Sequence, residues 1–535
     1  MNKIILSLIL VSSITIVEAQ STEDALRYSM NRNSGTARNI SLGGAMGALG
    51  GDFSGISTNP GGIAVYRSSE FTFTPSLHYS QTEANFYGTT SSDNKFNVPF
   101  QQIGFVGTYK PIREASSGLI STHFGIGYNR TNSYSRNTFI QATGLLSSLL
   151  DEYVDQANQG NWNDFYNGMA YDNYLLRNNP FEESEKKYLN DFQYVAEDPN
   201  TPNFGADQGL NHSRLISEKG NSGEFNLSLG ANFNHNLYLG ASMGISSQNY
   251  EKGITHFEEV NGGWESLTDA YIYYRALDGW EAREDFTFTE SVSTSGLGIN
   301  LKVGAIYKPT TSLRIGAAVH TPTFYSFDEE YNTSIESNYI DLGLDEINDE
   351  ALIYDTGGTD QDQLFGEFSY NFRSPFKAIG SLAYTFKNYG LISMDYEYLD
   401  YSSMQYYSST SSITEMQDIN NKNNLIKSIF RATHNFKFGA EFKPTEVFTL
   451  RAGYSTNQSP YKEGHFKNND KYQTFSGGIG YRMNDMFIDF GYMLRHEQYG
   501  YSLYTVAPNM PGGELETAEI DSKQHQLAVT LGWRF

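Results

Sequence analysis

The chain has 535 residues, a formal net charge of −24 and no cysteine. A chain of this charge is repelled by the polyanionic backbone of nucleic acid, so we exclude a nucleic-acid partner. The lack of cysteine excludes both disulfides and the acylated cysteine that anchors a lipoprotein.

The first residues have the layout of a secretory signal peptide. Lys3 precedes an apolar run at residues 4–17, and Val17-Glu18-Ala19 offers small-residue positions for cleavage before Gln20. We therefore expect residues 1–19 to be a signal peptide and leave them out of the fold. No later segment approaches the ~18 uninterrupted apolar residues that a membrane-spanning helix needs.

Residues 20–66 precede the first predicted strand and are rich in small residues. Gly44, Gly47 and Gly50 are a weak match to a phosphate-binding loop, because no predicted strand comes before them. Glycines of this kind suit a compact coil packed against a barrel wall, where the backbone turns with positive φ. We predict that residues 20–66 form a hatch inside a lumen. The predicted gating positions are Gly43, Gly44, Asn59, Pro60, Gly61 and Gly62.

Residues 67–535 contain about fourteen segments in which apolar and polar residues alternate, the even number expected of a bacterial β-barrel. The 39 Tyr, 35 Phe and 50 Gly fit a barrel, because only alternate residues of each strand meet lipid. We predict an all-β fold, a transmembrane antiparallel β-barrel in a Gram-negative outer membrane. The predicted strands are residues 70–82, 99–110, 118–131, 223–234, 237–250, 293–308, 312–324, 374–387, 390–402, 430–443, 447–457, 472–482, 485–498 and 523–535.

The last strand is the clearest of the fourteen. Leu527, Val529, Leu531, Trp533 and Phe535 share one face, and polar or small residues occupy the other. A terminal strand of this kind makes the barrel assembly machinery an expected partner, with outer-membrane lipids and lipopolysaccharide as the surroundings.

The connections alternate in length. Short turns are predicted at residues 234–236, 308–311, 388–390, 443–446 and 482–485, on the periplasmic side. Long loops are predicted at residues 132–222, 251–292 and 325–363, outside the cell. Because ordered loops of more than ~15 residues are usually functional, we expect ligand capture there.

Two groups of residues are candidates for ligand binding. The first is an aromatic collecting surface in the long loops, with Trp264, Trp280, Phe324 and Phe327 as its main members. The second is a set of cations on the lumen side of their strands, Arg314, Lys437 and Arg451. These cations could anchor a ligand carboxylate, or they could neutralise nearby acids and brace the hatch against the wall.

Asn59-Pro60 just before the first strand, about fourteen strands and an aromatic terminus together resemble the FadL/TodX family of outer-membrane transporters. The resemblance covers nearly all of the mature chain, although Gly61 stands where the family's hatch usually has alanine. The long loops look like those of Bacteroidetes members. The resemblance implies a monomer that takes up long-chain fatty acids or other hydrophobic molecules passively. Ligand binding would shift the hatch, and the cargo would leave through an opening in the wall.

Other functions stay open at this point. His78, His123 and His320 face the lumen by parity, but we find no nucleophile–base motif and no zinc-ligand spacing, so we expect no enzyme activity and no cofactor. A receptor for haem or another aromatic ligand is one alternative on the same scaffold. A structural or surface-interaction barrel that works through its large loops is another.

Overall fold

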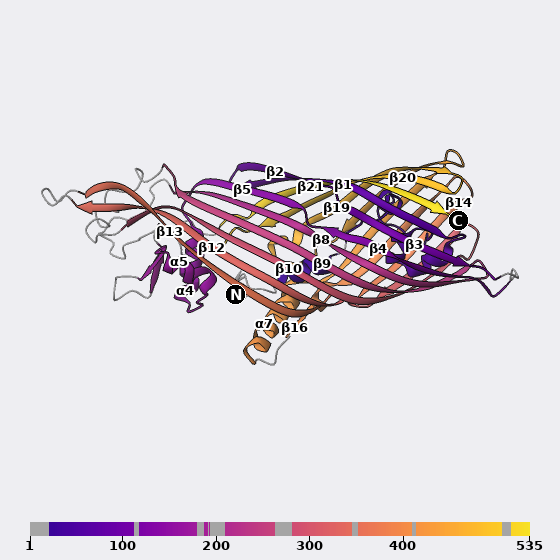
Figure 1. The fold of residues 1–535 in the computed structure, drawn as a ribbon, viewed down its shortest axis with the longest axis horizontal. Helices are drawn as coiled ribbons and strands as arrows, with labels where there is room; N and C mark the ends of the chain where they lie inside the picture. Colours follow the sequence, from indigo (N-terminus) through magenta and orange to yellow (C-terminus); the bar gives the residue numbers. More distant parts are fainter. Residues whose placement is uncertain are drawn as a thin grey trace, which may run out of the picture.

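The computed structural model describes residues 21–30, 32–111, 117–178, 187–190, 192, 209–262, 281–344, 351–408, 413–505 and 515–535. The predicted signal peptide lies outside these residues. The strands wind at a slant around one long barrel (Figure 1). None of the described helices is long and apolar enough to cross a membrane.

The barrel wall is one closed antiparallel sheet of fourteen strand paths, five of which are broken into two pieces. It closes where the last strand pairs with the first, with Glu70 opposite Arg534 and Phe71 opposite Trp533. The strands of the wall are β1 (Glu70–Phe86), β2 (Thr89–Asn97), β3 (Phe100–Tyr109), β4 (Leu119–Ser133), β5 (Arg136–Leu145), β8 (Leu210–Phe233), β9 (Leu237–Val260), β10 (Glu281–Tyr307), β11 (Leu313–His320), β12 (Phe324–Leu344), β13 (Ala351–Arg373), β14 (Lys377–Phe386), β15 (Gly390–Asp400), β16 (Gln405–Tyr407), β17 (Ala432–Phe442), β18 (Phe448–Asn457), β19 (Lys471–Met483), β20 (Met486–Tyr501) and β21 (Ala518–Arg534).

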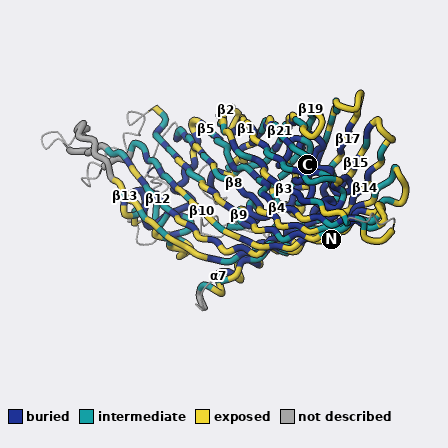
Figure 2. Tube along the Cα trace, turned by 45° about the vertical axis from the view of Figure 1, so that its right-hand side comes forward, coloured by how far each residue is buried: buried dark blue, intermediate teal, exposed yellow. Residues whose placement is uncertain are grey.

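The predicted alternation is confirmed in three dimensions. Leu229 is 68% exposed and Leu297 is 65% exposed on the outer face, whereas the inward Ser228 and Thr530 are buried. Stripes of buried and exposed residues alternate along the strands of the tube (Figure 2). One face of each spanning strand therefore suits lipid and the other suits a polar interior.

The breaks in three of the five interrupted strand paths coincide with prolines. Pro99 separates β2 from β3, Pro322 separates β11 from β12, and Pro375 separates β13 from β14. A proline cannot donate to the hydrogen-bond ladder, so a strand interior that contains one loses its regular pairing there. The sequence analysis did not predict the break between β11 and β12 or the break between β13 and β14.

The wall is tall on one side and low on the other. At about 3.3 Å per residue, the 24 residues of β8 run far beyond the ~30 Å hydrocarbon core, even when tilted. By contrast, β15 has 11 residues and β18 has 10. In Figure 1 the tall side, with β12 and β13, projects at the left end of the barrel.

This tall side corrects the prediction of three long loops. Much of residues 132–222, 251–292 and 325–363 is strand: β5, the outer parts of β8, β9 and β10, and β12 and β13. The prediction was wrong because strands beyond the membrane need no apolar outer face. Their alternation is therefore weak, and the sequence pattern there is that of a polar loop.

Helical segments fill the mouth of the tall side. They comprise α4 (Leu149–Asn158), η2 (Asp164–Gly168) and α5 (Met169–Asp172), with the small hairpin β6 (Leu176–Asn178) and β7 (Tyr188–Asn190). Leu150, Tyr153 and Met169 join Phe286 and Phe288 of β10 in one buried cluster. Above the low side, α7 (Ile413–Ile429) follows η4 (Tyr401–Ser403), and η5 (Phe466–Asn469) precedes β19.

Residues 21–66, apart from residue 31, lie inside the barrel, and we call them the N-terminal segment. It contains α1 (Thr22–Ser29), α2 (Ala37–Ser41), α3 (Phe53–Thr58) and η1 (Pro60–Val65). Each short helix begins with a polar cap: Ser21, Thr36, Asp52 and Asn59 accept hydrogen bonds from main-chain N–H groups of the first turn. These caps satisfy donors that a buried helix end would otherwise leave unpaired.

Candidate functional site

Asn59 connects the N-terminal segment to the wall. Its side-chain amide donates to the carbonyl of Gly47 at 2.6 Å and to the carbonyl of Ala305 on β10 at 3.1 Å. Its side-chain oxygen accepts from the N–H of Gly61 at 2.9 Å. One side chain thus holds the turn, the rest of the segment and the barrel together.

The glycines beside Asn59 allow a very close approach to the wall. A Cβ on Gly61 would lie 3.0 Å from the Cα of Ala305 and 3.0 Å from the carbonyl oxygen of Tyr238. Gly62 donates to Asn59 and accepts from the N–H of Gly51, at 3.1 Å. Alanine, which the resemblance implies at position 61, would therefore need a small shift of the wall.

The turn at Gly43 and Gly44 makes a second contact with the wall through Gly43, whereas Gly44 packs against Asn33 of the segment itself. Both have positive φ, +63° and +77°, which glycine adopts without strain. A Cβ on Gly43 would lie 2.8 Å from the main-chain nitrogen of Tyr454 on β18. Gly439 and Gly453 of the wall meet the same turn, so backbone packs on backbone here.

The three predicted cations all face the interior, and each has a partner. Arg314 donates to the carbonyl of Leu49 at 2.7 Å. Lys437 lies 3.4 Å from a carboxylate oxygen of Glu397. Arg451 donates to Glu441 at 2.9 Å and to Asp489 at 2.7 Å. In this structure the three cations brace the wall and the N-terminal segment.

The aromatic candidates lie in different places. Phe324 is 54% exposed on the outer face of β12, whereas Phe327 is 0% exposed and faces inward. The ring of Phe327 stacks on Tyr28 of α1, with ring centroids 4.4 Å apart. Trp264 and Trp280 lie outside the described residues.

Two polar cavities flank the N-terminal segment within the lumen. The upper cavity has a volume of about 190 Å³ and is lined by α1, Tyr250, Arg136 and Arg495, among others. The lower cavity, of about 120 Å³, is lined by Asn33, Lys302 and Lys437, among others. Arg32 lines both. Arg32 therefore lies between the two cavities.

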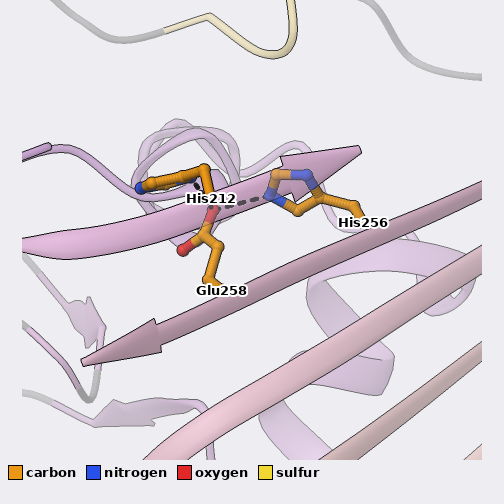
Figure 3. Close-up of side chains that lie close together, drawn as sticks. All are labelled: His212, His256 and Glu258. Atoms are coloured by element: carbon orange, nitrogen blue, oxygen red, sulfur yellow. Dashed lines mark hydrogen bonds and ion pairs between the residues drawn. The ribbon is translucent and has the colours of Figure 1, made fainter. Parts of the chain in front are cut away.

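His212, His256 and Glu258 form a fully buried group near the mouth, where β8 and β9 rise beyond the membrane (Figure 3). Their residue types could ligate a metal ion, and the sequence analysis missed them because His212 lies on another strand. The hydrogen bonds favour another role. Arg214 donates to Nδ1 of His256, so the ring proton sits on Nε2 and points to Glu258, 2.7 Å away. A metal ion could bind Nε2 only if that nitrogen lost its proton, and the other ring nitrogen cannot take the proton up while it accepts a hydrogen bond from Arg214.

Glu258 instead fastens helix α4 to the wall. Its carboxylate accepts from the N–H of Leu149 at 2.7 Å and from the hydroxyl of Ser148. A carboxylate at a helix N-terminus is stabilised by the unpaired N–H groups there. We call this group, His212, His256 and Glu258, the α4 latch.

A family model described as "Outer membrane protein transport protein (OMPP1/FadL/TodX)" matches residues 221–535. The chain belongs to this family. The FadL/TodX family resemblance predicted from the sequence is thus confirmed, as are the β-barrel fold and the outer-membrane location. No curated protein matches the sequence significantly.

Solved structures of FadL/TodX type share the fold. A Pseudomonas aeruginosa FadL homologue matches with a TM-score of 0.52 and 16% identity, over 95% of this chain and 100% of that one. The P. putida toluene transporter TodX matches with a TM-score of 0.50 and 12% identity, over 94% of this chain and 99% of that one. At such identities the likeness concerns the fold alone.

Several interior residues of this FadL/TodX family member were not singled out in the sequence analysis. Arg495 has the same strand parity as Asp489, the buried partner of Arg451 on the same strand, so parity could have found it. Arg32 lies in a segment without periodic pattern, so the sequence gave no signal for it.

The three histidines named in the sequence analysis all bond to neighbouring groups. His78 bonds to Gln101, His123 to Thr108 and His320 to the carbonyl of Thr58.

Proposed function

We propose that the protein is a passive outer-membrane channel for hydrophobic molecules, with long-chain fatty acids as its cargo. Family membership supports transport of hydrophobic compounds. The observation that carries the rest is the position of the N-terminal segment, which lines both lumen cavities and is tied to the wall by Asn59. A segment in that place acts as a hatch.

The hatch also meets the low side of the wall. Leu42 and Gly43 pack against Gly439 and Gly453, two adjacent strands of the low side. The outer face of the same region carries an apolar groove of about 540 Å³, which includes Leu382, Ile392 and Phe438. We propose this region as the route by which cargo released by the hatch reaches the membrane.

The cargo is tested in cells that lack their own outer-membrane fatty-acid channel. The full chain is expressed, and uptake of labelled oleate, toluene and haemin is compared with that of cells carrying an empty vector. Toluene is included because of the structural neighbour described as a toluene transporter, and haemin tests the receptor alternative. Accelerated oleate uptake is the expected result. If only toluene or only haemin were taken up faster than in the control cells, that compound would replace fatty acids as the proposed cargo. If none of the three were taken up faster, the proposal of a channel would be wrong.

A further inference from the structure

Strand β13 has an open edge on the tall side of the wall. From Gln361 to Arg373 it pairs with β12 in an unbroken antiparallel register. On its other side the three-residue β16 pairs with Asn371, Phe372 and Arg373. Residues 361–368 lie beyond β16, and no described strand pairs with them on that side. In Figure 1 this part of β13 projects together with β12.

Two aromatic residues of β13 show what a neighbouring strand changes. Phe368 and Tyr370 are two residues apart on the strand and therefore share its inward face. Tyr370 is 1% exposed, and Tyr406 of β16 packs against it with ring centroids 5.6 Å apart. Phe368, just beyond β16, is 38% exposed. A further strand in line with β16 would cover Phe368 as β16 covers Tyr370.

The open edge lies outside the hydrocarbon layer. On the outer face of β12 the apolar Phe324 is followed by the exposed acids Asp328 and Glu330. Charged side chains on the lipid face destabilise a barrel, so the lipid layer ends below Asp328. Residues 361–368 pair with residues 329–336, above Asp328. They are therefore accessible from outside the cell.

The same edge is acidic. Residues 324–339 of β12 and residues 361–370 of β13 contain no lysine, arginine or histidine. Their acids are Asp328, Glu329, Glu330, Glu336, Asp362 and Glu367. Glu330 and Glu367 are exposed and lie directly opposite each other, which is unfavourable for like charges. A second acidic strand, such as β13 of another copy, would add to this repulsion, whereas a cationic strand would relieve it.

We propose that the edge of β13 at residues 361–368 binds an extended cationic segment of another protein, which adds a strand to the sheet outside the cell. Main-chain hydrogen bonds hold this segment, and its side chains alternate between the two faces. Its apolar residues face inward onto Leu364 and Phe368, and its lysine or arginine residues face outward beside Glu367. The partner is thus a peptide or protein tail in which apolar and cationic residues alternate. This interaction is separate from transport and does not depend on the cargo.

The test measures binding of synthetic peptides to the purified full-length protein in nonionic detergent by fluorescence anisotropy. The probe is a labelled peptide in which valine and lysine alternate. One control peptide has glutamate in place of lysine. The other has the lysine sequence with every main-chain nitrogen methylated, which keeps the charge but removes the N–H donors. We expect the lysine peptide to bind about tenfold more tightly than either control, because only it offers both the charge and the main-chain hydrogen bonds.

Two kinds of variant locate the bound peptide. Glu367→Gln and Glu330→Gln should each weaken binding of the lysine peptide about two- to fivefold, as expected for exposed ion pairs. The matched control Glu83→Gln, which removes an exposed acid on β1, should bind as wild type. A lysine peptide with one central cysteine should form a disulfide with Gln363→Cys and not with Asn85→Cys on β1. The natural chain has no cysteine, so each product identifies its position.

Three results would contradict the proposal. Equal binding of the lysine peptide and its methylated form would show electrostatic attraction without strand pairing. Failure of the lysine peptide to bind, or equal cross-linking at both cysteine positions, would overturn the proposed edge as its site. Disulfide-linked dimers of Gln363→Cys that form in the absence of peptide, together with no peptide binding, would make a second copy of this chain the occupant. Oleate uptake in cells is independent of each of these results.

Discussion

The side-chain amide of Asn59 donates to the main-chain carbonyl of Ala305, across 246 residues of sequence. This bond joins η1 to β10. On the wall side, Gly304 leaves room for it, because a Cβ there would collide with the side-chain oxygen of Asn59. Both Asn59 and Gly304 thus help to fix the position of the N-terminal segment in the barrel.

Replacement of Asn59 by alanine should loosen the hatch. The carbonyls of Gly47 and Ala305 and the N–H of Gly61 would lose their partner, at a cost of about 1–3 kcal/mol for buried groups left unsatisfied. We expect a higher ion leak through single barrels in planar bilayers and a lower melting temperature. The exposed rim variant Asn85→Ala is the matched control. A leak equal to wild type in Asn59→Ala would show that the bond does not hold the hatch closed.

A reversible cross-link tests whether the hatch must move. A Cβ built on Gly47 lies 3.0 Å from Cβ of Ser381 on β14, slightly closer than the ~3.5–4.5 Å of a disulfide. Since the chain has no cysteine, the variant Gly47→Cys/Ser381→Cys forms one defined bond. Oleate uptake should stop when this bond is oxidised and return with reductant.

Each single-cysteine variant is the control for the cross-link and should transport under both conditions. Transport that persists in the fully oxidised double variant would mean that cargo passes without movement of this part of the hatch.

Arg451 should prove a structural residue. It donates to both Glu441 and Asp489, and removal of one partner from a buried ion-pair group typically costs about 3–5 kcal/mol. We expect Arg451→Met to lower the temperature at which the barrel loses its heat-resistant mobility in gel electrophoresis. Decanoate affinity, measured well below that temperature, should stay as in wild type. A large loss of affinity in a fully folded variant would make Arg451 a ligand anchor instead.

The α4 latch should weaken in acid. Burial, together with the neighbouring Arg214, lowers the pKa of His256 from 6.5 to about 3. Burial acts to raise the pKa of Glu258, but His212 and His256 outweigh it and hold that pKa well below its usual range. The docked state therefore prefers a neutral His256. Undocking lets this ring take up a proton, so docking is strongest above pH 6.5 and is lost as the pH falls toward 3.

The measurement uses a spin label on Gln159→Cys, just beyond the end of α4. We expect label mobility to be constant above pH 6.5 and to rise below it. His256→Gln should flatten this response, and Glu258→Gln should give a mobile label at every pH. Chelators should leave wild-type mobility unchanged, whereas mobility that rises on chelation at pH 7.5 would point to a metal ion in the latch.

Much of the barrel was predictable from the sequence. The segment at residues 237–250 marks the start of β9, and the terminal alternation from Leu527 to Trp533 reproduces the outer face of β21. The short turns at residues 234–236 and 443–446 lie between paired strands as predicted. These features could be predicted because lipid contacts only one face of a strand, so apolar and polar residues alternate along the sequence with a period of two.

The interior was less accessible to the same reasoning. Parity placed Arg451 and Lys437 inside, but it could not show that each would face a carboxylate. Those pairings depend on which strands are neighbours and on their register. Arg451 meets Glu441 because β17 pairs with β18, and a shift of one residue would point one of them outward.

The sequence by itself determined that the chain is a barrel with an apolar outer face, because the contrast between lipid and interior acts on every second residue of a strand. Only the tertiary structure decided how far the strands rise, how Asn59 meets Ala305 and which carboxylates Arg451 meets. The parts of the strands that rise beyond the membrane have no regular alternation of apolar and polar residues, so the sequence does not show how long they are. Contacts between distant residues depend on how the whole sheet closes and on its register, which no local sequence pattern contains.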